Sequence, residues 1–95
     1  MAARRVDLAP EADVSVAVAA YPGVDLVLVL TPGRDPVSQA MVEAAIAPLA
    51  ISAAPVARIN AVVPSPDASA EAVAAAVAYL AAAHSVTGQL LAVGT

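Results

Sequence analysis

The sequence predicts an α/β fold: one domain over residues 1–95, with about three helices and a small parallel sheet of three to four strands in three layers. Three observations carry this prediction. The length suits a single domain. Short runs rich in Val and Leu alternate with longer Ala-rich segments that begin at helix-capping residues, which is typical of strands alternating with helices. One of those runs is apolar almost throughout, as expected for a parallel strand covered on both faces.

The first third of the chain predicts a strand, a helix and a second strand. Val6–Leu8 is a short apolar entry, and a helix is expected to begin at Pro10, whose fixed φ suits a first helical position, and to run to about Ala20. Tyr21–Gly23 has the composition of a turn. Val24–Leu30 is the continuous apolar run and the most strongly predicted strand.

The middle of the chain predicts a long helix that contains a proline, Pro48. Asp35 is placed to cap this helix, with Pro36 as its first residue. Apolar residues then repeat at roughly helical spacing, at Val37, Met41, Ala45 and Leu49. Pro48 removes a backbone donor, so the helix is expected to kink or end near Ala44–Ala47, and Pro55 marks its limit.

The last third predicts a strand, a helix and a strand. Val56–Val63 is the next strand, and either Asp67 or Ser69 caps a third helix over Ala70–Ala83. Leu90–Val93 supplies the final strand.

The third helix has an unusual surface, because no charged residue follows Glu71 and most positions are Ala. Val73, Val77 and Leu80 form its stripe of larger side chains. One interpretation is an exposed helix rich in Ala, the best helix former. The other is close packing on two sides, against the sheet and against another chain.

The composition excludes several classes of function. The chain has no Cys, which excludes thiolate chemistry. It also has no Lys and a net charge of −4, which argue against nucleic acids and anionic membranes as partners. Asp7, Glu11 and Asp13 interrupt the start of the chain, so no signal peptide is expected. The uncharged segment Ala72–Thr95 is long enough to span a bilayer, but polar residues at its middle favour a helix plus a strand in a soluble protein. The absence of Cys fits a reducing cytoplasm, which is the expected location.

Two segments resemble the short-chain dehydrogenases/reductases. "LAISAAPVARINAVVPS" (Leu49–Ser65) is similar to the family segment in which a helix ends in Ala-Pro before an Arg-hydrophobic-Asn-Ala-Val-x-Pro strand. "AEAVAAAVAYLAAAHSVTGQLLAVGT" (Ala70–Thr95) resembles the family's closing helix and strand, with Thr87-Gly88-Gln89 at its Thr-Gly-Gln. The resemblance implies a Rossmann-like remnant, a truncated form of the family's C-terminal half. Val24–Leu30 resembles either the family strand that ends in Asn-Asn-Ala-Gly or the one that carries its catalytic Ser.

The same resemblance shows which parts of the family's chemistry are missing. The family binds its nucleotide at a Gly-rich turn, whereas the four glycines of this chain are scattered. Its catalytic Tyr stands three residues before a Ser-Lys step, and alignment from Ala54-Pro55 puts Asp35 at the Tyr, Ser38 at the Ser and Gln39 at the Lys. An exposed carboxylate is already ionised at neutral pH and has no proton to donate. No catalytic, cofactor-binding or metal-binding residue is therefore expected.

The expected function is a non-catalytic interaction subunit, a pseudoenzyme that pairs with itself or with a full-length reductase of the family. The last helix and strand would form the interface, through Val73, Val77, Tyr79, Leu80, Thr87, Gln89 and Leu91. No cofactor is expected unless a partner chain completes an NAD(P) site. Two alternatives stay open: an NAD(P)-dependent oxidoreductase component whose partner supplies the cofactor loop, and a carrier of a small ligand in the crevice near Thr31–Asp35.

Three further polar residues are not expected to bind a ligand or a metal. Arg34 and Arg58 could bind an anion, but structural or solvated roles are favoured. His84 lies at the predicted end of the third helix, where the helix dipole favours it, and a metal-binding role is disfavoured.

Overall fold

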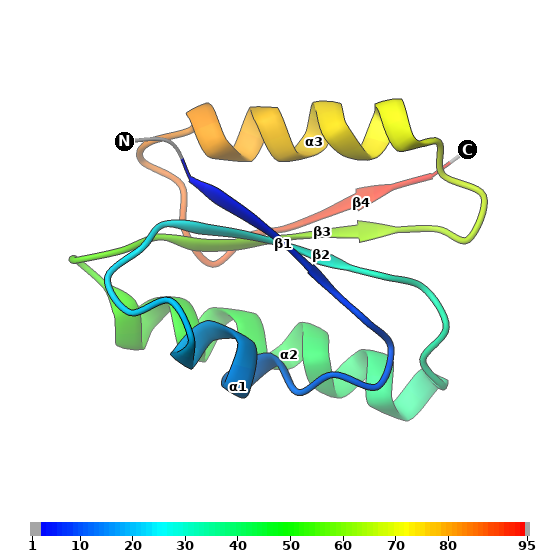
Figure 1. Cartoon of the computed structure of the whole chain (residues 1–95), viewed down its shortest axis with the longest axis horizontal. Helices are drawn as coiled ribbons and strands as arrows, with labels where there is room; N and C mark the ends of the chain where they lie inside the picture. The colour runs from blue at the N-terminus through cyan, green and yellow to red at the C-terminus, as the bar shows by residue number, and fades with distance from the viewer. Residues whose placement is uncertain (1–2, 95) are drawn as a thin grey trace.

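The computed structural model describes residues 3–94 and shows a parallel four-stranded sheet between two layers of helices (Figure 1). The strands lie side by side in sequence order. The elements are β1 (Arg4–Leu8), α1 (Val14–Ala19), β2 (Leu26–Leu30), α2 (Pro36–Ala53), β3 (Ile59–Pro64), α3 (Ala70–Ala82) and β4 (Leu90–Val93). The predicted three-layer α/β fold is confirmed, with three helices and four parallel strands.

Strand β2 is the centre of the molecule, and every one of its residues is buried. Leu26, Leu28 and Leu30 enter the core under α1 and α2, whereas Val27 and Val29 enter the core under α3. Alternate side chains of a strand point to opposite faces, so a strand between two cores must be apolar at every position. This explains the continuous run seen in the sequence.

Strand β1 is an edge strand with one covered face. Val6 and Leu8 pack into the core beside α1 and α2. Arg5 and Asp7 are exposed and form an ion pair of 2.7 Å with each other. From Arg5 to Leu8 the strand therefore alternates between charged and apolar residues, as a half-covered strand should.

The first helix is shorter than predicted. α1 begins at Val14, not at Pro10, because the carboxylate of Asp13 accepts hydrogen bonds from the backbone N–H groups of Ser15 (2.8 Å) and Val16 (3.2 Å). Asp13 is thus the N-cap. Residues 9–12 form a turn instead, in which the N–H of Ala12 donates to the carbonyl of Ala9.

The second helix does not end near Ala44–Ala47, one of the two outcomes predicted from Pro48. α2 continues to Ala53, and Asp35 caps it with Pro36 as its first residue, as expected. Pro48 and Ala44, whose carbonyl loses its helical donor, both lie on the exposed side of the helix, where water can replace that donor. Ile46 and Ala50 are buried on either side of the proline and hold both halves of the helix against the sheet.

The remaining elements follow the prediction with shifted ends. β3 begins at Ile59 rather than Val56, and the hydroxyl of Ser69 caps α3 by accepting from the N–H of Ala72 at 3.0 Å. Val73, Ala76 and Leu80 are the buried residues of α3. β4 pairs with β3 and forms the other edge of the sheet.

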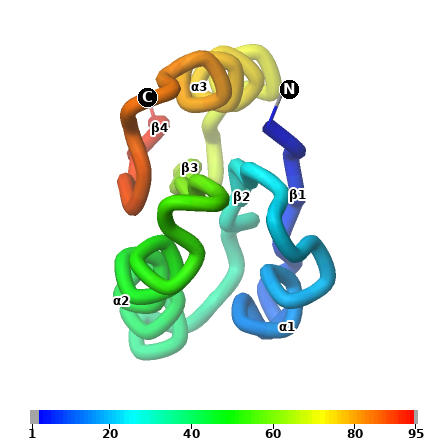
Figure 2. Tube along the Cα trace, turned by 90° about the vertical axis from the view of Figure 1, so that its left-hand side faces the viewer, coloured from blue at the N-terminus to red at the C-terminus, as the bar shows by residue number. Residues whose placement is uncertain are grey.

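The connection through α3 has the opposite hand to the other two. α1 and α2 cover one face of the sheet and α3 covers the other, as Figure 2 shows end on. Each connection moves one strand along the sheet in the same direction, so β1–α1–β2 and β2–α2–β3 are right-handed and β3–α3–β4 is left-handed. Left-handed crossovers are rare. The loops after β2 and β3 therefore leave the carboxyl edge of the sheet toward opposite faces.

Candidate functional site

Asp35 and Ser38 lie together at the start of α2, at the carboxyl edge of the sheet. The Asp35 carboxylate accepts hydrogen bonds from the backbone N–H of Ser38 at 2.9 Å and from its hydroxyl at 3.0 Å. These bonds, the backbone one first, lower the pKa of Asp35 below its ordinary value. The side chain is ionised at neutral pH, and its hydrogen bonds serve the helix cap.

Gln39 is also bonded within its own helix. Its side-chain amide donates to the carboxylate of Glu43 at 2.7 Å, one helical turn further on. A neutral amide bonded in this way supplies no positive charge to a neighbouring acid or to a nucleotide ribose. The three residues aligned with the family's catalytic positions are thus brought close together, but their polar groups bond to one another and to Glu43.

Arg34 fixes the loop between β2 and α2. Its guanidinium donates to the carbonyls of Thr31 (2.9 Å), Leu8 (3.3 Å) and Ala9 (2.8 Å), so it joins the ends of β1 and β2. Gly33 next to it has a φ of +128°, and a Cβ there would stand 3.0 Å from the ring of Pro10. The expected structural role of Arg34 is borne out by these contacts.

A depression of about 430 Å³ opens beside this loop. It lies between residues 10–15 on one side and Arg34, Ser38 and Val42 on the other. Glu11 and Asp13 give its wall negative charge, and the guanidinium of Arg34 is occupied by backbone carbonyls. The lining offers hydroxyl and carboxylate acceptors for a small polar ligand. No His lies among these lining residues.

The residues present do not fit a nicotinamide dinucleotide. A pyrophosphate binds where the N–H groups of a helix N-terminus are free and no negative charge stands in front of them. Here the carboxylates of Asp13 and Asp35 occupy the N-termini of α1 and α2, and α3 has Ser69 as cap and Glu71 in its first turn. Within residues 3–94, every helix N-terminus therefore carries its own cap.

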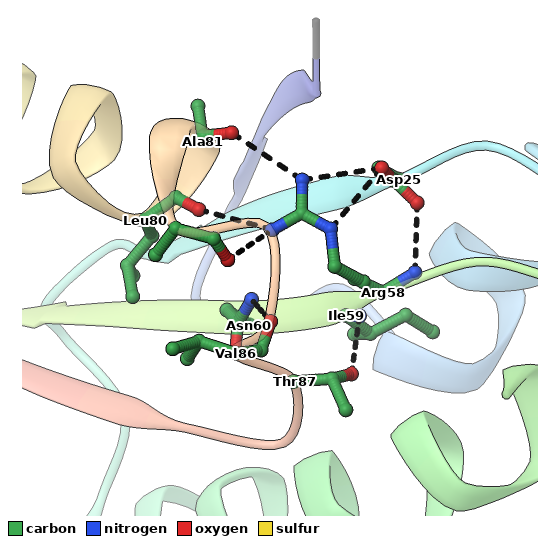
Figure 3. Close-up of polar contacts among 9 residues, drawn as sticks. Asp25, Arg58, Ile59, Asn60, Leu80, Ala81, Val86 and Thr87 are labelled. Carbon is green, nitrogen blue, oxygen red and sulfur yellow. Dashed lines mark hydrogen bonds and ion pairs between the residues drawn. The ribbon is translucent and has the colours of Figure 1, made fainter. Parts of the chain in front are cut away.

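A second polar cluster joins the amino end of β3 to the end of α3 (Figure 3). The Arg58 guanidinium contacts the carboxylate of Asp25 at 3.1 and 3.2 Å. It also donates to the carbonyls of Leu80 (3.3 Å), Ala81 (3.3 Å) and Ala83 (2.7 Å), and so caps the C-terminus of α3. Hydrogen bonds from Arg58, its backbone N–H first, lower the pKa of Asp25, although partial burial opposes the shift.

The segment that resembles the family's Thr-Gly-Gln is attached to β3 next to this cluster. The Thr87 hydroxyl accepts from the N–H of Ile59 at 3.1 Å, and the N–H of Gly88 donates to the carbonyl of Ile59 at 2.7 Å. The buried Asn60 side chain donates to the carbonyl of Val86 and accepts from the N–H of Gln89, both at 3.0 Å. Gly88 has a φ of +77°, which favours glycine. The motif residues therefore hold the last loop in place.

Asp25 and Asn60 were not singled out from the sequence. Both had a signal there: Asp25 directly precedes the central strand, and Asn60 is the one polar residue inside an apolar run. A polar residue in such a position needs a buried partner. The partners themselves lie 33 and 26 to 29 residues away, so the sequence does not reveal them.

The predicted interface residues have different environments. Val73 and Leu80 are buried in the chain's own core under α3, while Val77 and Leu91 are partly buried against it. Tyr79, Thr87 and Gln89 are exposed. Of the seven predicted residues, these last three are accessible to a partner.

Larger apolar side chains are exposed on α2. Val37 and Met41 are each 69% exposed and Ile51 is 76% exposed. Together with the exposed Pro48 they follow spacings of four, seven and three residues, which align on one side of a helix. We call these four residues the α2 stripe.

By length and composition, α2 is also the one helix among those described that could cross a membrane, yet its opposite side packs on the sheet.

The fold is an α/β, Rossmann-like arrangement, and Asp35 and Ser38 form the N-terminal cap of its second helix. The family model of short chain dehydrogenase-like proteins (SDR-like) matches residues 2–93. The chain therefore belongs to the SDR-like family. No curated protein matches it at a significant level.

Proposed function

We propose that this protein is a non-catalytic interaction subunit of the SDR-like family, which pairs with itself or with a full-length reductase of the family. The observation that carries the proposal is the α2 stripe, formed by Val37, Met41, Pro48 and Ile51. Contiguous exposed apolar side chains of this size are typical of association surfaces. Their spacing lets two such helices pack with their stripes facing each other.

The polar contacts at the start of α2 support the non-catalytic part of the proposal. Asp35 is ionised and bonded to Ser38, and Gln39 is bonded to Glu43, so neither is poised for proton transfer. The capped helix N-termini favour a protein that works without a nicotinamide cofactor. The absence of Cys fits a cytoplasmic setting, which is part of the same proposal.

The last helix and strand are a second possible docking surface. Tyr79 is 64% and Leu90 is 42% exposed, and β4 is an edge strand of the sheet formed by residues 3–94. The other outward residues of α3 are mainly Ala, which offer less apolar area per residue than Val, Met or Ile. We therefore assign the principal docking surface to the α2 stripe.

Light scattering coupled to size exclusion tests the proposal at micromolar concentration. We expect a particle of twice the chain mass of 9.3 kDa. Met41→Glu places a charge in the centre of the α2 stripe and should yield a monomer. Ser15→Glu is the control, since Ser15 is exposed in the first turn of α1, where an acid is favoured, and this variant should stay paired.

The outcomes separate the two surfaces and the two partners. A monomer from Tyr79→Glu, with Met41→Glu still paired, would move the docking surface to α3. A monomeric unaltered chain that also fails to form a complex with a co-expressed full-length reductase of the family would end the proposal. Saturable binding of NADH or NADPH to the isolated chain with a Kd below about 100 μM would contradict its non-catalytic part.

A further inference from the structure

An apolar pocket of about 240 Å³ lies at the amino edge of the sheet, opposite the edge that carries Asp35. It is formed between the C-terminal ends of α1 and α2 and the starts of β2 and β3. Figure 2 looks onto this edge of the molecule. The pocket is thus separate from the depression near Arg34 and lies at the end of the sheet that α/β folds do not normally use for ligands.

The walls of the pocket are apolar and carry no charge. Leu26 and Ile59, each 1% exposed, form part of its lining, together with Val18, Val24 and Leu49. None of its lining residues is Asp, Glu, Arg or His. A charged ligand would lose its hydration there without compensation, so the walls select a neutral molecule.

Two hydroxyl groups stand among these apolar walls. Tyr21 and Ser52 line the pocket, and neither side-chain hydroxyl has a hydrogen-bond partner among residues 3–94. The guanidinium of Arg4 lies over the Tyr21 ring, 4.6 Å from its centre, which holds the ring in place. Ser52 is exposed, so its hydroxyl is available at the mouth of the pocket.

We propose that this pocket binds a small neutral amphiphile, a single ring or short alkyl chain that carries one hydroxyl or carbonyl group. The volume fits such a ligand, because an apolar cavity of about 150 Å³ is enough to hold benzene. The apolar part would lie against Leu26 and Ile59, and the polar group would bond to Ser52 or Tyr21 at the mouth. This site goes beyond the proposed pairing and does not depend on it.

Titration of the ¹⁵N-labelled chain with p-cresol, followed by amide chemical shifts, tests the site. We expect saturable shifts confined to residues around the pocket, such as Gly23, Val24 and Ala57. Ala53→Leu fills the pocket and should weaken p-cresol binding at least tenfold. Ala82→Leu adds the same side chain on the exposed side of α3 and should leave binding unchanged. Shifts that do not saturate, or equal binding by Ala53→Leu, would overturn the proposal.

A second variant decides the matter if Ala53→Leu fails to fold. Ser52→Ala changes an exposed residue on α2 and removes only the hydroxyl. It should weaken p-cresol binding three- to tenfold and leave binding of toluene, which has no hydroxyl, unchanged. Unaltered p-cresol binding by both Ser52→Ala and Tyr21→Phe would contradict the assigned polar contact, and the absence of toluene binding would contradict the apolar one.

Discussion

Asp25 and Arg58 form a partly buried ion pair across the starts of β2 and β3, with two side-chain contacts of 3.1 and 3.2 Å and a third from the Arg58 N–H at 2.8 Å. The same guanidinium reaches the carbonyls at the end of α3. One side chain therefore joins the centre of the sheet to the helix that covers its far face. Loss of Arg58 should loosen three elements at once.

Arg58→Ala is expected to lower the free energy of unfolding by about 2–4 kcal/mol, because it leaves the Asp25 carboxylate and the α3 carbonyls without their donor. Urea unfolding followed by circular dichroism measures this. A domain of this size has about 5–10 kcal/mol in total, so the loss is large. Arg5→Ala is the matched control: its ion pair with Asp7 is exposed, and its removal should cost less than about 1 kcal/mol. Equal effects of the two variants would show that the Arg58 cluster contributes little.

Stability is expected to fall in acid because of Asp25. Its pKa in the folded protein lies below the ordinary value of 3.8, so the folded state binds the proton less readily than the unfolded state. The contribution is present above that value and disappears as the pH falls from about 4 through the lowered pKa. The midpoint of urea unfolding, measured from pH 6 to pH 2, should therefore decrease less steeply for Asp25→Asn. Asp35 acts in the same direction, so some slope should remain in that variant.

Asn60→Ala should destabilise the protein by about 2–3 kcal/mol. The Asn60 side chain is only 1% exposed, so its removal leaves the Gln89 N–H and the Val86 carbonyl without a partner in the interior. Hydrogen exchange offers a local measurement. In the Asn60→Ala variant, the Gln89 amide should exchange faster than the amides of β2. Exchange at Gln89 that is unchanged in the variant would mean that the last loop is held by Thr87 and Gly88 alone.

Pro48→Ala is expected to raise the free energy of unfolding by about 1–3 kcal/mol, because the new N–H can bond to the Ala44 carbonyl inside α2. Urea unfolding measures the gain. Pro36→Ala is the control, since a proline at the first helical position costs nothing in hydrogen bonds and its removal should change stability by less than about 1 kcal/mol. A loss of stability in Pro48→Ala would indicate that the proline ring makes packing contacts worth more than the missing bond.

Most of the architecture follows from local sequence signals. The run ending at Leu30 predicts a buried strand, and Asp35 and Ser69 predict helix starts, because these are decided by neighbouring residues. The start of α1 was misplaced because both Pro10 and Asp13 are good starting residues, and the hydrogen bonds of Asp13 decide between them. The end of α2 was misplaced because burial of Ile46 and Ala50 outweighs the local cost of Pro48.

The residues of the candidate site come from the resemblance to the family, and their bonding does not follow from it. That Asp35, Ser38 and Gln39 stand at the positions of the family's chemistry stays a prediction, whereas the bond from Gln39 to Glu43 is seen only in the structure. The left-handed connection through α3 is also invisible in the sequence, since a crossover of either hand has the same strand and helix pattern. The face that each helix covers decides which side chains are exposed, and this is why the α2 stripe could not be assigned from spacing alone.

The left-handed connection leaves α3 over β2, β3 and β4, while the same face of β1 meets water at Arg5 and Asp7. The two borders of the sheet therefore differ in kind. Charges along the β1 border oppose the addition of another strand. No charged residue lies in β4, which consists of Leu90, Leu91, Ala92 and Val93. A further strand is therefore opposed by charge at the β1 border, whereas at the β4 border it would meet only apolar side chains.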